Sequence, residues 1–572
     1  MSIDIETYRL KAQEAIEYVF VKEYHNSLGI PMPIVKMLLP DDANYSTGQY
    51  YITIDKTWQI HLNFGKLPIS YHEFQNEVKV LTRHEIEHYM CCPFDVITHF
   101  RMLKRIRDVY YKHFSHLGIN IEYACGAISN QAADIIVDTK NYYRHSKETL
   151  KSEIDWIKIG ANISACPRHC KLMFLTKEAI WKEDLGINET DPEFLKIVHQ
   201  LADSFTKNGI EDKSSFLDKV EEYAEIFFKL YVEDQKNPQQ SSQQGSQQQS
   251  SQQGSQQQSG QQGSQQQSGQ WGVGRPKDGD EHGNAFVFAD PDKVKEAIEV
   301  LAEETSVEEF IDLLAIAGII GMSDKQKGVL WFNVQSANII PIVEFSNTGN
   351  KSSYTYPSVW RIGDPIEELD LMLTYMTSPR LIPGMTTKKW EYVSNDDNGT
   401  ESKQMDLLLV VDTSGSMGSV MKESANMHQA VLASYGILSY FESTKSKVAF
   451  IGFSDKIDAY VDWSDKYDDV RERLLTNGHG GTKFPISRIK STLDVRSRDL
   501  VTVLITDGDL GNINESVSYF RDYLNDDNKL YIFLLGGSKS LHSYEPLKNI
   551  GAKIYNANNA NEFCDMVLTD ME

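Results

Sequence analysis

Two histidines and a glutamate with metal-site spacing lie in the stretch His84-Glu85-Ile86-Glu87-His88. Residues four apart project from one face of a helix, so His84 and His88 can hold one Zn²⁺ between their imidazoles. Glu85 follows the first histidine, and its carboxylate can take a proton from a zinc-bound water. Since zinc lowers the pKa of that water toward about 7, the pattern is typical of hydrolysis at neutral pH. An exposed, charged helix turn is the alternative interpretation.

A zinc site of this kind needs a third protein ligand, preferably from another rigid element. The segment from Gly126 onward offers Asn130 and Asp134, which project one turn apart from the same side of a helix. Asp138 follows after one further turn. By residue type and spacing alone, each of these three side chains could complete the site.

A second set of oxygen-bearing side chains lies in the last third of the chain. Asp412, Ser414 and Ser416 alternate directly after an apolar run that is typical of a buried strand. Thr482 follows a glycine-rich turn, and Asp507 ends another apolar run. In an open α/β sheet such turns meet at the carboxyl edge of the strands, where ligands bind. Hydroxyls with only two carboxylates suit Mg²⁺, which keeps waters or an open position.

The elements that must position the first set are a hairpin and two helices. Residues 50–54 and 59–64 alternate in polarity around a polar turn, which predicts a β-hairpin. Ser70 and Glu73 form a capping box, which predicts the start of a helix that carries both histidines on its inward face. A second helix is predicted over about 120–145. Further helices are predicted near 173–183, 193–207 and 214–232.

From residue 404 onward, apolar strands alternate with helical stretches, which predicts a parallel sheet with helices on both faces. The strands are expected at 406–411, 447–453, 500–505, 529–535 and 552–555, and the helices at about 419–442, 486–494, 513–525, 543–549 and 560–568. Asp412 and Asp507 are therefore expected at the same edge of this sheet.

Between Gln239 and Gln270 the chain contains only Gln, Ser and Gly, in a nine-residue repeat. No position there is apolar, so the segment cannot bury surface and is predicted to be a disordered tether rather than a repeat fold. Treated as a random coil, it has an end-to-end distance of about 30–35 Å. Such a tether lets the flanking halves of the chain dock on each other or separate.

These patterns predict a multidomain protein. Residues 1–236 are expected to form a mainly helical α+β domain, followed by a disordered Gln/Ser/Gly linker at 237–275. Residues 276–403 carry helical patterning and short extended runs, and we interpret them as a packing module of the following domain. Residues 404–572 are expected to form an α/β domain with a Rossmann-like alternation of strands and helices.

The composition of the chain indicates which partners it is expected to bind and in which cellular compartment it is expected to lie. The chain has 57 basic and 81 acidic residues, a net charge of −24, which argues against nucleic acid or anionic lipid as a partner. No run approaches about 18 apolar residues, so no membrane span is expected. The N-terminus lacks the basic and apolar regions of a signal peptide. Six cysteines in 572 residues favour a reducing cytoplasm over a disulfide framework.

The second set of side chains resembles a known type of site. The stretch DTSGS from Asp412 to Ser416, Thr482 in its glycine-rich loop, and Asp507 are similar to the metal-ion-dependent adhesion site (MIDAS) of von Willebrand factor A (VWA) domains. The resemblance implies a VWA fold in which these residues and Ser414 bind Mg²⁺, directly or through water. A carboxylate from a partner protein could complete the coordination.

The first set resembles the zincin metallopeptidases, in particular a bacterial group that carries HExxH, then N-x-A-x-D, then a C-terminal VWA-like domain. Here N-x-A-x-D runs from Asn130 to Asp134. The gluzincin pattern has Glu at the position of Asn130, so this chain departs from that pattern. The resemblance favours Asp134 as the third zinc ligand, with Asn130 or Asp138 as alternatives, and Glu85 as the general base.

Together these resemblances imply an intracellular zinc metallopeptidase that hydrolyses peptide bonds and whose VWA domain binds a protein partner or substrate. Proteins of the resembled group are often paired with MoxR-type AAA+ ATPases, which implies an ATPase partner. The alternative is a non-catalytic VWA adaptor for such an ATPase, with a structural metal in the N-terminal domain. A subunit of a metal-chelatase-like assembly is a third hypothesis.

Overall fold

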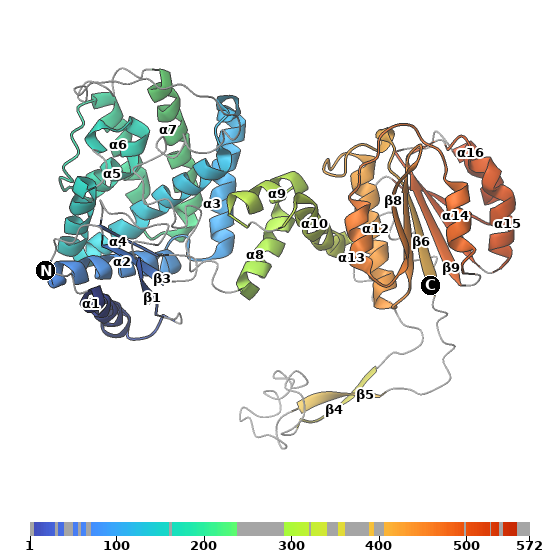
Figure 1. Ribbon diagram of the computed structural model, residues 1–572, viewed down its shortest axis with the longest axis horizontal. Helices are drawn as coiled ribbons and strands as arrows, with labels where there is room; N and C mark the ends of the chain where they lie inside the picture. The colour runs from blue at the N-terminus through green and yellow to red at the C-terminus, as the bar shows by residue number, and fades with distance from the viewer. Residues whose placement is uncertain are drawn as a thin grey trace, which may run out of the picture. The chain divides into compact units, whose positions relative to one another are not determined.

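The chain forms two compact units, Met1–Lys327 and Gly328–Glu572. The first unit is mainly helical, and the second is built around a mixed β-sheet (Figure 1). The computed structural model describes residues 5–28, 32–38, 50–54, 59–64, 70–159, 163–236, 291–319, 322–339, 353–360, 388–393, 405–496, 499–508, 510–526, 528–536 and 541–557.

Helices make up most of the described part of the first unit. They are α1 Ile5–Glu17, α2 Tyr71–Met90, α3 Val96–Val109, α4 Ile121–Ile159, α5 Arg168–Trp181, α6 Pro192–Thr206, α7 Phe216–Lys236, α8 Pro291–Glu304 and α9 Val307–Ile316. The helices predicted near 173–183, 193–207 and 214–232 are confirmed as α5, α6 and α7. No pattern used above predicts α3, although Asp95 marks its start by accepting a hydrogen bond from Thr98 N.

The helix with the HExxH motif begins where the capping box predicts. Ser70 Oγ accepts a hydrogen bond from Glu73 N (3.3 Å), and the Glu73 carboxylate accepts one from Ser70 N (3.2 Å). This reciprocal pair satisfies two backbone N–H groups that the first turn would otherwise leave open. The inward face of α2 buries Phe74, Val78 and Ile86 together with both motif histidines.

Three short strands form a sheet in the order β1-β3-β2 beside these helices, with bounds β1 Ile34–Leu38, β2 Tyr50–Ile54 and β3 Gln59–Phe64. β2 and β3 are antiparallel, which confirms the predicted hairpin. β1 adds a parallel neighbour to β3. A parallel partner is joined by a longer connection rather than a tight turn, so no local turn signal predicts it.

The helix α4 is longer than the predicted helix over 120–145, and it is not straight. It contains 39 residues, and His145 within it has φ −136° and ψ 49°, outside the helical region. His145 therefore divides α4 into two helical parts. The first part carries the segment from Asn130 to Asp138, which supplies the candidate third ligands.

The segments on either side of the glutamine-rich stretch belong to the same unit. The helix α7 ends at Lys236, α8 begins at Pro291, and both pack against α3. The next helix, α9, packs on α3 and α4, and Arg107 of α3 donates a hydrogen bond to Asp312 of α9 (2.7 Å). The interpretation of this region as a packing module of the following domain is therefore wrong for α8 and α9, which are bound to α3.

The second unit contains a six-stranded sheet in the order β11-β10-β9-β6-β7-β8. The strands are β6 Asp406–Asp412, β7 Val448–Phe453, β8 Ile457–Ser464, β9 Leu500–Thr506, β10 Lys529–Leu535 and β11 Lys553–Ala557. All neighbouring strands are parallel except β7 and β8. The sheet is mixed rather than parallel throughout, because β8 returns beside β7 after a short turn.

Helices cover both faces of this sheet, as the alternating pattern predicts. Figure 1 shows α12 and α13 on one face and α14, α15 and α16 on the other. Their bounds are α12 Asn426–Ser443, α13 Tyr467–Leu474, α14 Ile486–Leu493, α15 Val517–Asn525 and α16 Leu541–Lys548. The chain leaves β6 toward β7 on one side and later crosses to β9 on the other, so a topological switch point lies between β6 and β9.

Three further elements lie outside the sheet: α10 Asp324–Ile339, and the antiparallel pair β4 Ser353–Val359 and β5 Lys388–Val393. The predicted linker at 237–275 and the predicted helix at 560–568 lie outside the described residues.

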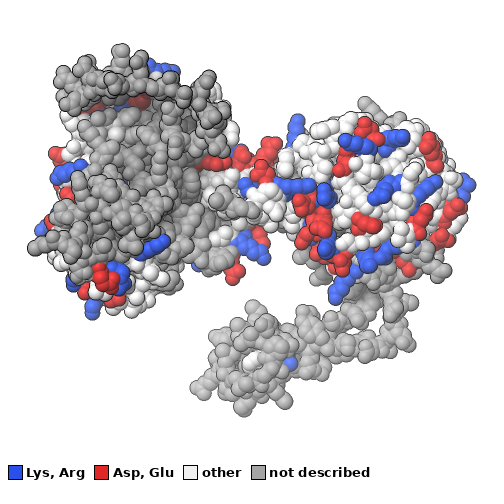
Figure 2. Space-filling model, viewed as in Figure 1, with Lys and Arg blue, Asp and Glu red and all other residues white. Residues whose placement is uncertain are grey.

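Among the described helices, none has both the length and the apolar character needed to cross a membrane. Figure 2 shows acidic and basic side chains interspersed over the coloured face of the second unit.

Candidate metal centre

The two motif histidines lie one turn apart on α2, and each is held through its Nδ1 atom. Nδ1 of His84 lies 2.6 Å from Oδ1 of Asp138, and Nδ1 of His88 lies 2.8 Å from the carbonyl oxygen of Cys92. Both partners are acceptors, so each Nδ1 carries a proton and donates it. This arrangement leaves both Nε2 atoms to face a shared third partner, as in metal-binding histidines.

Asp134 of α4 is that shared partner. Its Oδ1 lies 3.5 Å from Nε2 of His84 and 3.3 Å from Nε2 of His88, and the two Nε2 atoms lie 3.1 Å apart. The three side chains are all buried, with exposed fractions of 5%, 4% and 3%. Among the described residues, they are the group of histidine, cysteine and carboxylate side chains that could hold a metal ion.

The other two candidate ligands occupy different places around this cluster. Asn130 Nδ2 donates a hydrogen bond to Oδ2 of Asp134 (3.1 Å), so it holds the oxygen that faces away from the histidines. Asp138 accepts from the Nδ1 side of His84 rather than the Nε2 side. Of the three alternatives left open by spacing, Asp134 is therefore the one that the structure brings to both Nε2 atoms.

The distances within the cluster match a small tetrahedral ion. Ligand atoms placed tetrahedrally at 2.0–2.1 Å from an ion lie about 3.3–3.4 Å from one another. The three observed separations are 3.1, 3.3 and 3.5 Å. Two imidazole nitrogens favour a first-row transition metal or zinc over Mg²⁺ or Ca²⁺, which prefer oxygen ligands. The residues present therefore fit zinc or a neighbouring transition metal.

Charge around the cluster favours a cation. Burial lowers the pKa of His84, but the carboxylates of Asp138, Asp134 and Glu85 together raise it to about 9. Burial raises the pKa of Asp138, yet Lys177 and His84 together lower it below its usual value. In the metal-free protein His84 thus carries a second proton near neutral pH. A metal that binds at Nε2 takes the place of that proton.

Glu85 is buried beside His84, with an exposed fraction of 7%. Its carboxylate is close enough to His84 to raise the pKa of that histidine. The neighbouring glutamate of the motif, Glu87, has a different role, because it forms ion pairs with Lys140 (2.8 Å) and Arg144 (2.8 Å) of α4. Glu87 therefore joins α2 to α4, whereas Glu85 lies next to the candidate ligands.

Two residues that the sequence analysis does not identify lie behind the cluster. Lys177 of α5 donates hydrogen bonds to Asp138 (2.6 Å) and to Glu153 (2.7 Å) in the second part of α4. Burial lowers the pKa of Lys177, but Asp138 and Glu153 raise it above its usual value. The predicted helix near 173–183 contains Lys177, but no local spacing marks this residue, since its partners are distant in sequence.

Four of the five predicted MIDAS residues form a connected group at the end of β6. Asp412 is fully buried and accepts a hydrogen bond from Ser414 N (2.9 Å). Ser414 Oγ lies 3.1 Å from Ser416 Oγ, which donates to Oδ1 of Asp507 (3.2 Å) after β9. The other oxygen of Asp412 accepts from Thr506 Oγ1 (2.7 Å). The group lies beside the switch point between β6 and β9.

Thr482 lies in the loop that packs against this group, and it is half-buried. Gly415 N donates a hydrogen bond to Gly480 O (3.3 Å), which joins the DTSGS turn to the loop two residues before Thr482. A Cβ atom at Gly478 would lie 2.4 Å from Oδ2 of Asp458 and 2.5 Å from the carbonyl oxygen of Thr413. The close approach of this loop to the end of β6 therefore requires glycine at 478.

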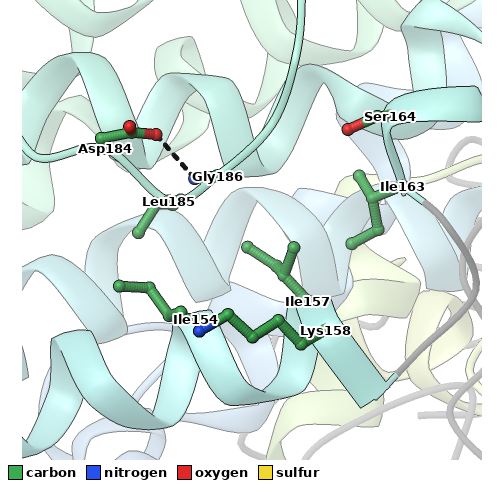
Figure 3. Close-up of a pocket in the computed structure, with 8 residues that line it drawn as sticks. All are labelled: Ile154, Ile157, Lys158, Ile163, Ser164, Asp184, Leu185 and Gly186. Atoms are coloured by element: carbon green, nitrogen blue, oxygen red, sulfur yellow. Dashed lines mark hydrogen bonds between the residues drawn. The ribbon is translucent and has the colours of Figure 1, made fainter.

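A separate cavity of about 540 Å³ lies at the end of α4. It is lined by Ile154, Ile157, Lys158, Ile163, Ser164, Asp184, Leu185 and Gly186, and Figure 3 shows Leu185 facing Ile154 and Ile157. Asp184 accepts a hydrogen bond from Gly186 N (2.7 Å) within it. The cavity contains none of the candidate ligands, so it is not part of the metal centre.

A scan against protein-family models found no match, and a search of curated proteins found none either. Among solved structures, the conserved hypothetical protein BatB from Bacteroides thetaiotaomicron is 13% identical, with a TM-score of 0.25, over 29% of this chain and 98% of that chain. An uncharacterized membrane spanning protein from Vibrio fischeri is 17% identical, with a TM-score of 0.13, over 29% of this chain and 96% of that chain. Neither likeness carries an argument about this chain.

Proposed function

We propose that the protein is a zinc-dependent metallopeptidase with a zincin-like N-terminal domain. The observation that carries the proposal is the convergence of His84 Nε2, His88 Nε2 and Asp134 Oδ1, with separations of 3.1–3.5 Å. These are the separations that tetrahedral zinc coordination needs. The HExxH and N-x-A-x-D patterns of the sequence support peptide bonds as the substrate.

The number of protein ligands favours catalysis over a structural role. Structural zinc sites usually have four protein ligands, whereas catalytic sites have three and keep one position open. The cluster contains three such side chains among the described residues. When bound, zinc would lower the pKa of a coordinated water and polarise the substrate carbonyl. Glu85, adjacent to His84 and buried with it, would accept the proton of the attacking water.

We further propose that the C-terminal unit is a VWA-like domain that binds a protein partner through Mg²⁺. The five-residue pattern Asp412, Ser414, Ser416, Thr482 and Asp507 supports this proposal. The hydrogen bonds that join four of these side chains at one edge of the sheet support it as well. By the resemblance of both halves, the partner would be a MoxR-type AAA+ ATPase or a substrate that it delivers.

A non-catalytic adaptor is the second candidate function, and one observation favours it. His84, Glu85, His88 and Asp134 have exposed fractions of 7% or less. A peptide must reach the metal for hydrolysis, so deep burial suits a metal that stabilises the fold. In this case the VWA-like domain would dock the ATPase, and the N-terminal domain would bind zinc but hydrolyse no peptide.

The deciding experiment compares the zinc-loaded wild type with Glu85→Gln on casein. The peptidase proposal expects hydrolysis by the wild type, a loss of roughly 100-fold or more in Glu85→Gln from the general-base contribution, and unchanged zinc content. Glu87→Gln is the matched control in the same motif, because Glu87 pairs with Lys140 and Arg144. It should lower stability but keep hydrolysis.

Two other results would contradict the proposal in different ways. A wild type that holds one zinc and cleaves nothing would favour the adaptor. Cleavage that persists in Glu85→Gln would not support the adaptor; it would remove Glu85 as the base. For the adhesion site, recovery of partner proteins in Mg²⁺ is compared between wild type and Asp412→Ala. Equal recovery would contradict binding through Asp412.

A further inference from the structure

Lys177 is a buried cation directly behind the metal centre, with an exposed fraction of 2%. Its Nζ donates to Oδ2 of Asp138 (2.6 Å) and to Oε1 of Glu153 (2.7 Å). Burying an ammonium group is costly unless it is paired, and here two carboxylates pair it. The three residues form a compact ionic cluster that the proposed reaction does not itself use.

The bend in α4 makes this cluster possible. Asp138 and Glu153 are 15 residues apart, which would place them about 22 Å apart along a straight helix. One ammonium group nevertheless reaches both carboxylates. The non-helical conformation at His145 must therefore turn the second part of α4 back toward the first. Lys177 of α5 joins the two parts at the depth of the metal centre.

Asp138 connects this cluster to the candidate ligands. Its Oδ1 accepts from Nδ1 of His84 (2.6 Å), while its Oδ2 accepts from Lys177 (2.6 Å). A carboxylate held at both oxygens cannot rotate without breaking one of these bonds. Its fixed orientation in turn fixes the His84 ring, whose Nε2 faces Asp134 and His88.

We propose that Lys177 is a positioning residue of the metal centre, which holds Asp138 so that His84 presents Nε2 to the metal. The inference rests on the metal-binding part of the proposed function and not on peptidase activity. Outer-shell partners of a ligating histidine typically contribute 10–100-fold to metal affinity. Lys177 acts one contact further out, so its removal should weaken binding about tenfold, near the lower limit of that range.

The competing explanation is an ordinary buried ion pair that only stabilises the fold. The same helix contains a matched example, because Lys171 is also buried and pairs with Glu189 (2.9 Å). Lys171 contacts none of the candidate ligands. A variant of each lysine therefore separates loss of a buried ion pair from loss of positioning.

The test measures Zn²⁺ affinity by competition with a chromophoric chelator, and the visible absorption spectrum of the Co²⁺-loaded protein. Lys177→Met should weaken Zn²⁺ binding about tenfold and alter the Co²⁺ spectrum. Lys171→Met should leave both unchanged, even if it lowers the unfolding temperature. Equal affinity and spectra in wild type and Lys177→Met would overturn the inference.

A second variant covers the case in which Lys177→Met does not fold. Lys177→Met/Glu153→Gln removes one positive and one negative charge, so the cluster keeps its net charge while Asp138 loses its anchor. This variant should show the same loss of affinity, whereas Glu153→Gln alone, which keeps the Lys177–Asp138 pair, should bind zinc like the wild type. Wild-type affinity in the double variant would contradict positioning through Asp138.

A double-mutant cycle with Asp138→Asn tests the route of the effect. If Lys177 acts through Asp138, Lys177→Met should cost little further affinity once Asp138 is replaced. Additive losses would overturn that route. Failure of the proposed function is distinguishable from failure of this inference. If the wild type binds no zinc, the metal centre itself is removed. If the wild type binds zinc and Lys177→Met binds it with equal affinity, only this inference is removed.

Discussion

Asp134 and Asp138 are identical residues one turn apart on α4, and the two ring nitrogens of His84 give them different roles. Asp138 holds Nδ1, and Asp134 faces Nε2 together with the second histidine. Helical spacing places both residues on one side and cannot distinguish them. The distinction depends on the ring orientations of the two histidines. Asp138 holds the ring of His84, and the carbonyl oxygen of Cys92 holds the ring of His88.

Substitutions of Asp134 and of its hydrogen-bond partner Asn130 should lower zinc affinity to different extents. Asp134→Ala removes one of the three proposed ligands and should lower zinc affinity by roughly 100-fold or more, beyond the range typical of an outer-shell partner. Asn130→Ala removes only the hydrogen bond to Oδ2 of Asp134, and should lower affinity by about tenfold. Chelator competition measures both. A larger loss of zinc affinity in Asn130→Ala than in Asp134→Ala would mean that Asn130, and not Asp134, is the ligand.

The loop before Thr482 allows a second prediction at single residues. A Cβ atom at 478 would lie 2.4–2.5 Å from Asp458 Oδ2 and Thr413 O, so Gly478→Ala should destabilise the second unit by about 1–3 kcal/mol. Gly481 in the same loop has no atom within 4 Å of a Cβ, so Gly481→Ala is the matched control. Urea unfolding of both variants checks this. Equal stability would contradict the tight packing of the loop on β6.

At the level of whole elements, the packing of α7 against the start of α5 depends on one carboxylate, that of Asp234. Asp234 near the end of α7 accepts hydrogen bonds from Arg168 Nε (2.8 Å) and from His169 N (3.2 Å) and Nδ1 (2.8 Å). These groups lie at the start of α5, where a negative charge is favourable. Burial raises the pKa of Asp234, but the hydrogen bonds from His169 and Arg168 lower it below its usual value.

The lowered pKa predicts how stability changes with pH. The contribution of Asp234 is fully present above its unfolded pKa of about 3.9 and is lost as the pH falls through the lower folded value. Asp234→Asn should therefore lower the free energy of unfolding by about 1.5–3 kcal/mol at pH 7. That difference from the wild type should shrink below pH 4, since the wild type then loses the same contribution.

Denaturant unfolding at several pH values measures this difference. Glu233→Gln is the control, because Glu233 also pairs with Arg168 (2.9 Å) but its side chain is 57% exposed. It should change stability by about 0–1 kcal/mol at any pH. A difference between Asp234→Asn and wild type that stays constant below pH 4 would contradict the assignment.

In the whole molecule, the glutamine-rich stretch connects two helices of one unit. Since α7 and α8 both pack on α3, the 54 residues between them (237–290) close a loop within the first unit. By composition, this stretch is predicted to be a tether between two halves of the chain. Composition identifies the absence of apolar positions there, but only the packing of α8 and α9 identifies what the stretch connects.

Loop closure predicts the effect of shortening this stretch. Deleting the 32 residues from Gln239 to Gln270 should raise the free energy of unfolding of the first unit by about 0.8 kcal/mol, because a shorter loop loses less entropy on closure. Zinc content should not change. Thermal unfolding and metal analysis measure both, with a shuffled sequence of equal length as the control. A loss of stability would show that the stretch contributes specific contacts.

Local features of the fold follow from short stretches of the sequence. The capping box at Ser70 specifies the start of α2, and the hairpin follows from alternation. Apolar runs specify five of the six strands of the large sheet, but they do not predict β8. Each signal lies within a few residues, where spacing and residue type act directly on the backbone. The His84–His88 pair and the three candidate third ligands, Asn130, Asp134 and Asp138, belong to the same class of prediction.

Contacts between groups that are distant in sequence depend on tertiary packing. Lys177 reaches Asp138 and Glu153 because α4 bends at His145, and no short-range pattern encodes that contact. The same holds for the pairing of β1 with β3 and for the attachment of α9 to α3 through Arg107. These contacts depend on where whole helices and strands pack, so they are fixed by burial and charge pairing across the fold rather than by neighbours in sequence.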